Sequence, residues 1–261
     1  MTPGAPNRVG VGLLFPDLLG TYGDSGNAVV LARRLEWRGI AAEVVTVRSG
    51  DPVPIGLGFY VLGGGEDLPQ ALAARHLGPA SGDPLRRAVE GGAVVLAVCA
   101  GLQVLGTSFL GPDGSESEGL GLLDCRTARG TGPRAVGEIV VEPDPELELP
   151  LLTGYENHAG VTVLGPGARP LGRVVTGVGN GDGSGCDGVR CGKVLGTYMH
   201  GPVLARNPAL ADLLLSWVVG DLVPVDDTEM EDLRAERLGA AMAGPSGRRV
   251  GSLSWLHRRR P

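Results

Sequence analysis

One stretch near the middle of the chain constrains its fold more than any other: residues 93–106, with the sequence AVVLAVCAGLQVLG. Its first six residues are apolar and rich in valine, which predicts a strand that is covered on both faces, as in a parallel sheet. The small residues Ala100 and Gly101 then allow a sharp turn after Cys99 into a helix. This order of strand, turn and helix is the pattern of a nucleophile elbow.

An elbow of this kind places a cysteine at the N-terminus of a helix. Backbone N–H groups and the helix dipole favour a thiolate there, and the same N–H groups can receive an oxyanion. The alternative is a buried structural cysteine, because free cysteine is among the most buried residue types. On this stretch alone, both interpretations of Cys99 remain open.

A second apolar strand, residues 193–202 with the sequence KVLGTYMHGP, ends at His200 and breaks at Gly201-Pro202. A thiol nucleophile needs a base within hydrogen-bond reach, and a histidine at the end of a neighbouring strand can supply it. Cys99 and His200 therefore form a candidate catalytic pair. His158, in the segment GYENH, is the alternative base.

Composition limits the class of protein. With 261 residues, 43% of them hydrophobic, the chain can build one α/β core, which we expect over residues 1–222, with a charged helix and tail over residues 223–261. The formal net charge of −6 provides no basic surface for nucleic acid, so we expect no nucleic-acid partner.

Neither a membrane segment nor a leader peptide is expected. No apolar run approaches the roughly 20 residues of a membrane span, and the N-terminus lacks the pattern of a signal peptide. We therefore expect a cytoplasmic protein. Its four cysteines would remain thiols in a reducing compartment. Cys125, Cys186 and Cys191 could bind zinc together with a histidine, but their spacing matches no common ligand pattern, so we predict no metal site.

Apolar runs and helical patterns alternate in the first half of the chain. This alternation predicts a parallel sheet with right-handed crossovers, with strands at 9–15, 42–47 and 58–62 and helices at 27–37, 67–77 and 83–90. We expect Asp83 to cap the last of these helices. The second half predicts an antiparallel extension, and hence a mixed sheet, from short strands at 137–142, 151–156, 161–164, 173–178 and 187–190.

The two motifs together resemble a known family. Residues 97–103 (AVCAGLQ) and 196–201 (GTYMHG) are similar to class I glutamine amidotransferases, in the branch that includes cobyric acid synthases. Within that branch, residues 21–27 (TYGDSGN) and 63–70 (GGGEDLPQ) look like the glutaminase subunits of lipid II isoglutaminyl synthases. The resemblance covers roughly residues 8–220. It implies a flavodoxin-like α/β fold, a mostly parallel sheet flanked by helices.

The resemblance also implies a reaction, the hydrolysis of the side-chain amide of L-glutamine through a thioester on Cys99. His200 would take the thiol proton and return it to the leaving ammonia. The backbone N–H of Ala100, together with one from the glycine turn at Gly64 and Gly65, would form the oxyanion hole. The alternative for the glycines is a flexible turn. Gln103 and His158 would support the site from neighbouring elements.

Two further site residues concern the substrate and the base. The resemblance implies that Arg134, in the segment GPRAVG, binds the α-carboxylate of glutamine, a task that suits its planar guanidinium. The alternative is a surface arginine in a loop. Many class I amidotransferases carry a glutamate two residues after the histidine, where this chain has Pro202. The missing acid would then be Glu156 or a residue of a partner chain.

No cofactor is expected on this chain. Residues 23–27 (GDSGN) lack the spacing and the lysine of a P-loop, so ATP and Mg²⁺ would bind to the partner. The resemblance implies a heterodimer with a Mur-ligase-like synthetase, which amidates D-glutamate to D-isoglutamine in the stem peptide of lipid II. The alternatives are a glutaminase for cobyric acid-type or other amidation and a catalytically silent scaffold. Leu253, Trp255 and Leu256 in the tail are expected to contact a partner or the body.

Overall fold

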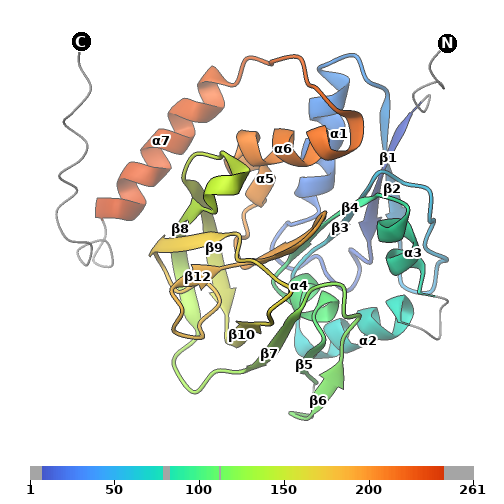
Figure 1. Ribbon diagram of the computed structural model, residues 1–261, viewed down its shortest axis with the longest axis vertical. Helices are drawn as coiled ribbons and strands as arrows, with labels where there is room; N and C mark the ends of the chain where they lie inside the picture. Colours follow the sequence, from blue (N-terminus) through green and yellow to red (C-terminus); the bar gives the residue numbers. More distant parts are fainter. Residues whose placement is uncertain (1–7, 79–82, 112, 244–261) are drawn as a thin grey trace.

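The computed structural model describes residues 8–78, 83–111 and 113–243 (Figure 1). At its centre is a six-stranded sheet with the strand order β13-β14-β4-β3-β1-β2. All neighbouring strands pair in parallel except β13 and β14, which are antiparallel. The strands are β1 (Val9–Leu14), β2 (Ala42–Val47), β3 (Phe59–Leu62), β4 (Val94–Val98), β13 (Val189–Cys191) and β14 (Val194–Thr197).

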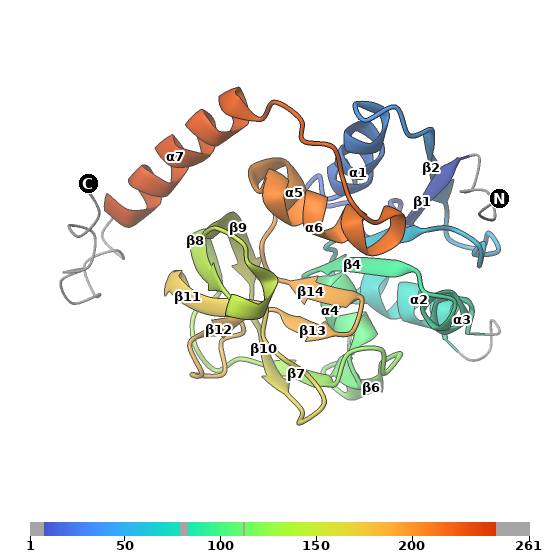
Figure 2. The same cartoon turned by 45° about the horizontal axis from the view of Figure 1, so that its top comes forward.

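Helices cover both faces of this sheet, which explains why its inner strands are continuous apolar runs. Every residue of β3, β4 and β14 is buried. Figure 2 shows α1, α5 and α6 on one side of the sheet and α2 and α4 on the other. The helices are α1 (Gly26–Glu36), α2 (Asp67–Leu77), α3 (Pro84–Glu90), α4 (Ala100–Leu105), α5 (Val203–Arg206) and α6 (Pro208–Val219).

The second half of the chain builds two smaller sheets beside the central one. Their strand orders are β10-β7-β5-β6 and β12-β11-β8-β9. The mixed, mostly parallel α/β fold is confirmed, and most of the expected antiparallel strands lie in these two sheets. Their elements are β5 (Ser108–Leu110), β6 (Glu116–Glu118), β7 (Cys125–Arg129), β8 (Ala135–Pro143), the 3-10 turn η2 (Pro145–Leu147), β9 (Leu152–His158), β10 (Gly160–Leu164), β11 (Gly172–Thr176) and β12 (Cys186–Asp187).

One local prediction is wrong. Asp83 precedes α3 as expected, but its side chain makes no capping hydrogen bond, and its backbone lies in the left-handed region with φ of +50°. The Asp83 carboxylate instead accepts a hydrogen bond of 2.8 Å from Nε of Arg86. The Asp83 carboxylate was expected to accept a hydrogen bond from the backbone of α3, but it bonds the Arg86 guanidinium.

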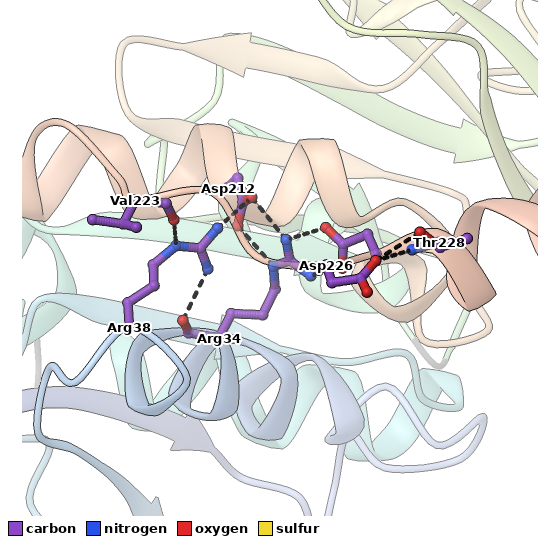
Figure 3. A network of polar contacts seen from close by, with 7 residues as sticks. Arg34, Arg38, Asp212, Val223, Asp226 and Thr228 are labelled. Atoms are coloured by element: carbon purple, nitrogen blue, oxygen red, sulfur yellow. Dashed lines mark hydrogen bonds and ion pairs between the residues drawn. The ribbon is translucent and has the colours of Figure 1, made fainter.

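A polar cluster joins the C-terminal segment to the body of the molecule (Figure 3). Arg34 of α1 donates from Nε to Oδ1 of Asp212 in α6 and from Nη1 to Oδ1 of Asp227, each at 2.7 Å. Arg38 donates from Nη2 to Oδ2 of Asp212 and from Nε to the carbonyl oxygen of Val223, also at 2.7 Å. These bonds hold the connection between α6 and the last helix against α1.

The last helix, α7 (Thr228–Ala243), is the charged helix expected after residue 222. It packs against β8 and β9, and Ala241 is its one buried residue in the part of the chain that the structure describes. The division into two units at residue 222 stays a prediction. The tail beyond α7, with its predicted apolar contacts, lies outside the described residues. None of the helices described here is both long and apolar enough to cross a membrane.

Candidate active site

Cys99 lies at a strained turn between β4 and α4. Its backbone has φ of +52° and ψ of −108°, a conformation that non-glycine residues rarely adopt. The Cys99 N–H donates to the carbonyl oxygen of Thr197 at 2.9 Å, and the Gly101 N–H donates to that of Gly63 at 3.1 Å. A Cβ atom on Gly101 would lie 2.8 Å from Cβ of Leu62, so the turn needs glycine there. These features match the geometry of a nucleophile elbow.

His200 follows β14, the strand that pairs with β4. Its backbone is fixed by two hydrogen bonds with Tyr155, of 2.8 and 3.1 Å. A Cβ atom on Gly64 would lie 2.6 Å from Cε1 of His200 and 3.4 Å from Cβ of Cys99. The imidazole and the thiol-bearing side chain therefore flank the same glycine, and a side chain at Gly64 would displace one of them.

The acid that contacts the base comes from the loop between β1 and α1. Oδ2 of Asp24 lies 2.8 Å from Nδ1 of His200, and both side chains are buried. An ionised carboxylate only accepts hydrogen bonds, so Nδ1 carries the proton and Nε2 keeps its lone pair. Nε2 of His200 has no hydrogen-bond partner within the described chain and is free to receive a proton. Sequence reasoning missed Asp24, although it lies in the segment 21–27 that carried the family resemblance.

Glu156, the acid that the sequence offered from this chain, has other partners. Its carboxylate accepts the backbone N–H groups of Val178 at 2.8 Å and Gly179 at 2.9 Å. Its nearest histidine is His158, whose Nε2 lies 3.8 Å from Oε2 of Glu156. The expectation that Glu156 contacts the base is wrong, because the carboxylate is already used to hold the loop after β11.

Cys99 is a protonated thiol in this site. Burial and, to a smaller extent, the negative charge of Asp24 raise its pKa to about 12, against the lowering effects of the Ala100 N–H and the Arg134 charge. Cys99 is only 6% exposed. The expected thiolate is therefore not the resting state, because desolvation outweighs the stabilisation by one backbone N–H.

Of the expected oxyanion donors, Ala100 and Gly65 line the cavity in front of Cys99 and Gly64 does not. The Ala100 N–H contacts the Cys99 sulfur, where it can also meet an oxyanion formed next to that sulfur. Gly65 lines the cavity beside Cys99. The Gly64 N–H, in contrast, donates to Oδ2 of Asp24 at 3.0 Å. In this structure the Gly64 amide is thus occupied by the acid and does not serve the cavity.

The cavity in front of Cys99 has a volume of about 180 Å³. Gln103 and His158 line it, and their supporting role stays a prediction. Nε2 of Gln103 donates to the Tyr198 hydroxyl at 3.1 Å, and Oε1 of Gln103 accepts from Nε2 of Gln70 at 3.0 Å. The His158 ring stacks on Tyr198 with centroids 3.8 Å apart. Gln103 of α4 and His158 of β9 thus both contact Tyr198 beside the cavity.

Arg134 lies at the rim of the same cavity, just before β8. Its Nε donates to Oδ1 of Asn157, and its Nη2 donates to the carbonyl oxygen of Asn157 at 3.1 Å. Among the described residues, its side-chain hydrogen bonds go to Asn157 and none goes to a carboxylate. The guanidinium is therefore held in place while its charge stays available to an anionic ligand.

Within residues 8–78, 83–111 and 113–243 no cluster of three or more metal-ligating side chains occurs.

Comparison with known proteins decides the family. Residues 10–208 match the CobB/CobQ-like glutamine amidotransferase domain. The chain belongs to this amidotransferase family. Class I amidotransferases hydrolyse glutamine, so this CobB/CobQ-like member is a glutamine-hydrolysing enzyme.

Relatives of this CobB/CobQ-like amidotransferase include subunit GatD of lipid II isoglutaminyl synthase (glutamine-hydrolyzing). The Staphylococcus aureus protein is 38% identical over 76% of this chain and 79% of its own length. The Streptococcus pneumoniae protein is 34% identical over 81% of this chain and 80% of its own length. Cobyric acid synthase of Sphingopyxis alaskensis is 35% identical over 67% of this chain, but only 34% of that enzyme is matched.

Solved structures agree with the fold of the family. A glutamine amidotransferase crystal structure has a TM-score of 0.55 and 26% identity, covering 80% of this chain and 98% of the other. The glutaminase domain of Trypanosoma brucei CTPS with bound acivicin has a TM-score of 0.52 and 11% identity, covering 82% and 96%. The second likeness supports the fold alone.

Proposed function

We propose that this amidotransferase is the glutaminase subunit of a lipid II isoglutaminyl synthase. It hydrolyses L-glutamine to glutamate and ammonia, and a second subunit consumes the ammonia. The observation that carries the proposal is the convergence of Cys99, His200 and Asp24 beside a cavity whose rim bears Arg134. The identity of 34% and 38% to two GatD subunits supports the specific pathway.

The first half-reaction forms a thioester. Sγ of Cys99 attacks the side-chain carbonyl carbon of glutamine while Nε2 of His200 takes the thiol proton. The carbonyl oxygen becomes an oxyanion, which the N–H groups of Ala100 and Gly65 receive. Collapse of this intermediate breaks the carbon–nitrogen bond, and His200 returns the proton to the leaving nitrogen. Ammonia leaves, and a γ-glutamyl thioester remains on Cys99.

The second half-reaction releases glutamate. Water attacks the thioester carbonyl while Nε2 of His200 accepts one of its protons, and the same donors receive the oxyanion. Collapse breaks the carbon–sulfur bond, and His200 returns the proton to the sulfur. The thiol that burial favours is thereby restored, since the pKa of Cys99 is raised to about 12.

Arg134 is the proposed receptor for the substrate's α-carboxylate. Asn157 fixes the guanidinium from Nε and Nη2, and none of its side-chain hydrogen bonds among the described residues goes to a carboxylate. A glutamine that pairs its carboxylate with Arg134 would direct its side-chain amide towards Cys99, because both residues line the same cavity. An arginine is suited to this task since its donors form a rigid fork.

The second subunit is proposed to be a Mur-ligase-like synthetase that binds ATP and Mg²⁺. It would activate the α-carboxylate of D-glutamate in the stem peptide of lipid II and amidate it with the ammonia, giving D-isoglutamine. The two GatD relatives are named as subunits, which supports a heterodimer. We place this complex in the cytoplasm, where ATP is available.

The experiment combines the purified chain with a Mur-ligase-like synthetase, ATP, Mg²⁺, glutamine and lipid II. Mass spectrometry of the stem peptide should show conversion of one carboxyl group to a carboxamide, dependent on glutamine. Glutamine hydrolysis without stem-peptide amidation would favour another acceptor, as in a cobyric acid-type amidation. Absence of glutamine hydrolysis in the complex would favour a silent scaffold.

A further inference from the structure

Asp24 makes two contacts through a single carboxylate oxygen. Oδ2 accepts Nδ1–H of His200 at 2.8 Å and the backbone N–H of Gly64 at 3.0 Å. Asp24 is 0% exposed, and its second oxygen, Oδ1, has no hydrogen-bond partner within the described chain. A buried carboxylate is costly unless its interactions repay the desolvation, so a carboxylate at this place needs an explanation.

The contact with His200 sets the state of the base. A carboxylate at Nδ1 selects the tautomer whose Nε2 lone pair is free, and it stabilises the positive charge that the imidazole gains when it takes a proton. The Tyr22 ring packs against the imidazole, with centroids 4.5 Å apart. The ring of His200 is therefore held both in orientation and in tautomer.

The hydrogen bond between Asp24 and the Gly64 N–H helps to fix the backbone of the glycine turn. The carbonyl oxygen of Gly64 accepts the N–H of Thr21 at 3.3 Å, while the Gly64 N–H is held by Asp24. Both bonds come from the loop between β1 and α1. In a trans peptide unit the C=O and N–H point in opposite directions. Anchoring the Gly64 carbonyl to Thr21 thus turns the Gly65 N–H away from that loop, and Gly65 lines the cavity.

Other buried acids near the site do not share these contacts. Asp187 accepts the Thr197 hydroxyl at 2.6 Å and the Tyr198 N–H at 3.3 Å. Glu156 accepts the N–H groups of the loop after β11. Asp24 is the one acid in the described chain with a hydrogen bond to the side chain of His200.

We propose that Asp24 is a positioning residue that completes the catalytic group within this chain, and that it couples the base His200 to the oxyanion turn at Gly64 and Gly65. The proposal rests on the proposed glutaminase function. It differs from the sequence expectation, in which a partner chain was an alternative source of the third member. Asp24 acts through His200 and the glycine turn and does not touch the substrate.

The first test is the kinetics of Asp24→Asn, in the isolated chain and in the complex with its synthetase. Loss of the orienting carboxylate from a nucleophile–histidine–acid group lowers kcat by about 10⁴-fold. We expect a fall of about 100-fold or more in kcat for glutamine hydrolysis, with KM changed by less than about threefold, because Asp24 binds no substrate. Adding the synthetase should not restore the rate.

Two isosteric variants serve as controls. Asp187→Asn changes another fully buried carboxylate beside β14, and Glu156→Gln changes the acid that the sequence offered for this role. Both should keep kcat within about tenfold of the wild type, since neither contacts His200. An equal loss of kcat in Asp187→Asn would mean that any buried acid supports the site only through folding, and the proposal would be withdrawn.

The second test is spectroscopic and independent of turnover. In ¹⁵N-histidine-labelled protein, His200 should show the Nδ1–H tautomer with a downfield, hydrogen-bonded proton, and Asp24→Ala should abolish that resonance while a circular dichroism spectrum confirms the fold. A wild type without the Nδ1–H resonance overturns the inference. If the resonance is present but no preparation hydrolyses glutamine, the proposed function fails while the Asp24 contact stands.

Discussion

At the residue scale, the surroundings of Cys99, the proposed nucleophile, disfavour its thiolate form. Cys99 has a strained backbone, is nearly fully buried, and keeps its proton because desolvation raises its pKa to about 12. Cys125 is buried as well, and its pKa is also raised to about 12 by desolvation. Cys186 and Cys191 are partly exposed. Reactivity at Cys99 should therefore require a substrate that engages His200.

This difference predicts two labelling patterns. A small neutral alkylating reagent at pH 7 should modify Cys186 and Cys191 before Cys99, because the thiolate is the reactive form and the Cys99 thiolate is disfavoured. A glutamine analogue with an electrophilic side chain should instead modify Cys99 first. Peptide mass spectrometry of partially labelled protein gives the order. Fastest labelling of Cys99 by the small reagent would show a resting thiolate and contradict this account.

Arg134 offers a prediction on substrate binding. Arg134→Ala should lower kcat/KM for glutamine by roughly 10- to 150-fold, which corresponds to the loss of about 1.5–3 kcal/mol from a hydrogen bond to a charged group. Arg134→Lys should recover only part, because lysine lacks the planar fork. Steady-state glutaminase assays measure both. Labelling of Cys99 by a small reagent without a carboxylate should not change, and its collapse in Arg134→Ala would instead assign Arg134 to the fold.

Asp187 predicts a pH dependence of stability. Burial raises its pKa from the usual 3.8 to about 6, so between these values the folded state holds this proton more tightly than the unfolded state. Its contribution to the free energy of unfolding is therefore full below pH 3.8 and is lost as pH rises through about 6. Urea unfolding between pH 4 and pH 7 should show this loss in the wild type and a weaker pH dependence in Asp187→Asn. A stronger pH dependence of unfolding in Asp187→Asn than in the wild type would contradict the raised pKa of Asp187.

At the scale of elements, the sequence predicted those parts whose pattern is local. The strand β4 and its elbow, the helices α1 and α2, and the strand that ends before His200 could be predicted, because each shows its hydrophobic period in one continuous run. The sequence could not predict that the remaining strands form two separate sheets, because these strands are short and pair with distant segments. The capping rule failed at Asp83, because the Asp83 carboxylate accepts a hydrogen bond from Arg86 and not from the helix backbone.

The Arg34 cluster is an element-scale contact with a measurable consequence. Desolvation lowers the pKa of the Arg34 guanidinium, but hydrogen bonds and charges from Asp227 and Asp212 outweigh it and raise the pKa above its usual range. Removing Arg34 leaves Asp227 without this partner, while Asp212 keeps Arg38. Because both acids are partly exposed, the cost should be about 1–3 kcal/mol, below that of breaking a fully buried pair. Arg34→Ala should therefore lower the free energy of unfolding by roughly this amount.

Arg33 on the same helix is a matched control. Its ion pair with Glu36 is on the surface, with the Arg33 side chain 64% exposed against 3% for Arg34. Arg33→Ala should change the free energy of unfolding by less than about 1 kcal/mol. Denaturant titrations of both variants measure the difference. Equal losses would show that the cluster in Figure 3 does not hold α1, α6 and the segment before α7 together.

At the scale of the whole molecule, the site is assembled from segments far apart in the chain. Asp24 and His200 are separated by 176 positions, so no spacing rule could pair them. The strands that precede Cys99 and His200 pair in parallel, which is why the sequence could place the two residues at the same edge of the sheet. Distant backbone contacts, such as the Gly64 amide with Asp24, required the fold itself.

The central claim is that Cys99 performs the first half-reaction and that a partner uses the ammonia. Its most direct test is Cys99→Ser in the complex with the synthetase, assayed with ATP, Mg²⁺ and lipid II, and with either glutamine or ammonium chloride as nitrogen source. The account predicts that glutamine-dependent amidation of the stem peptide disappears while ammonia-dependent amidation stays at the wild-type rate. Loss of both activities, or retention of the glutamine-dependent one, would contradict it.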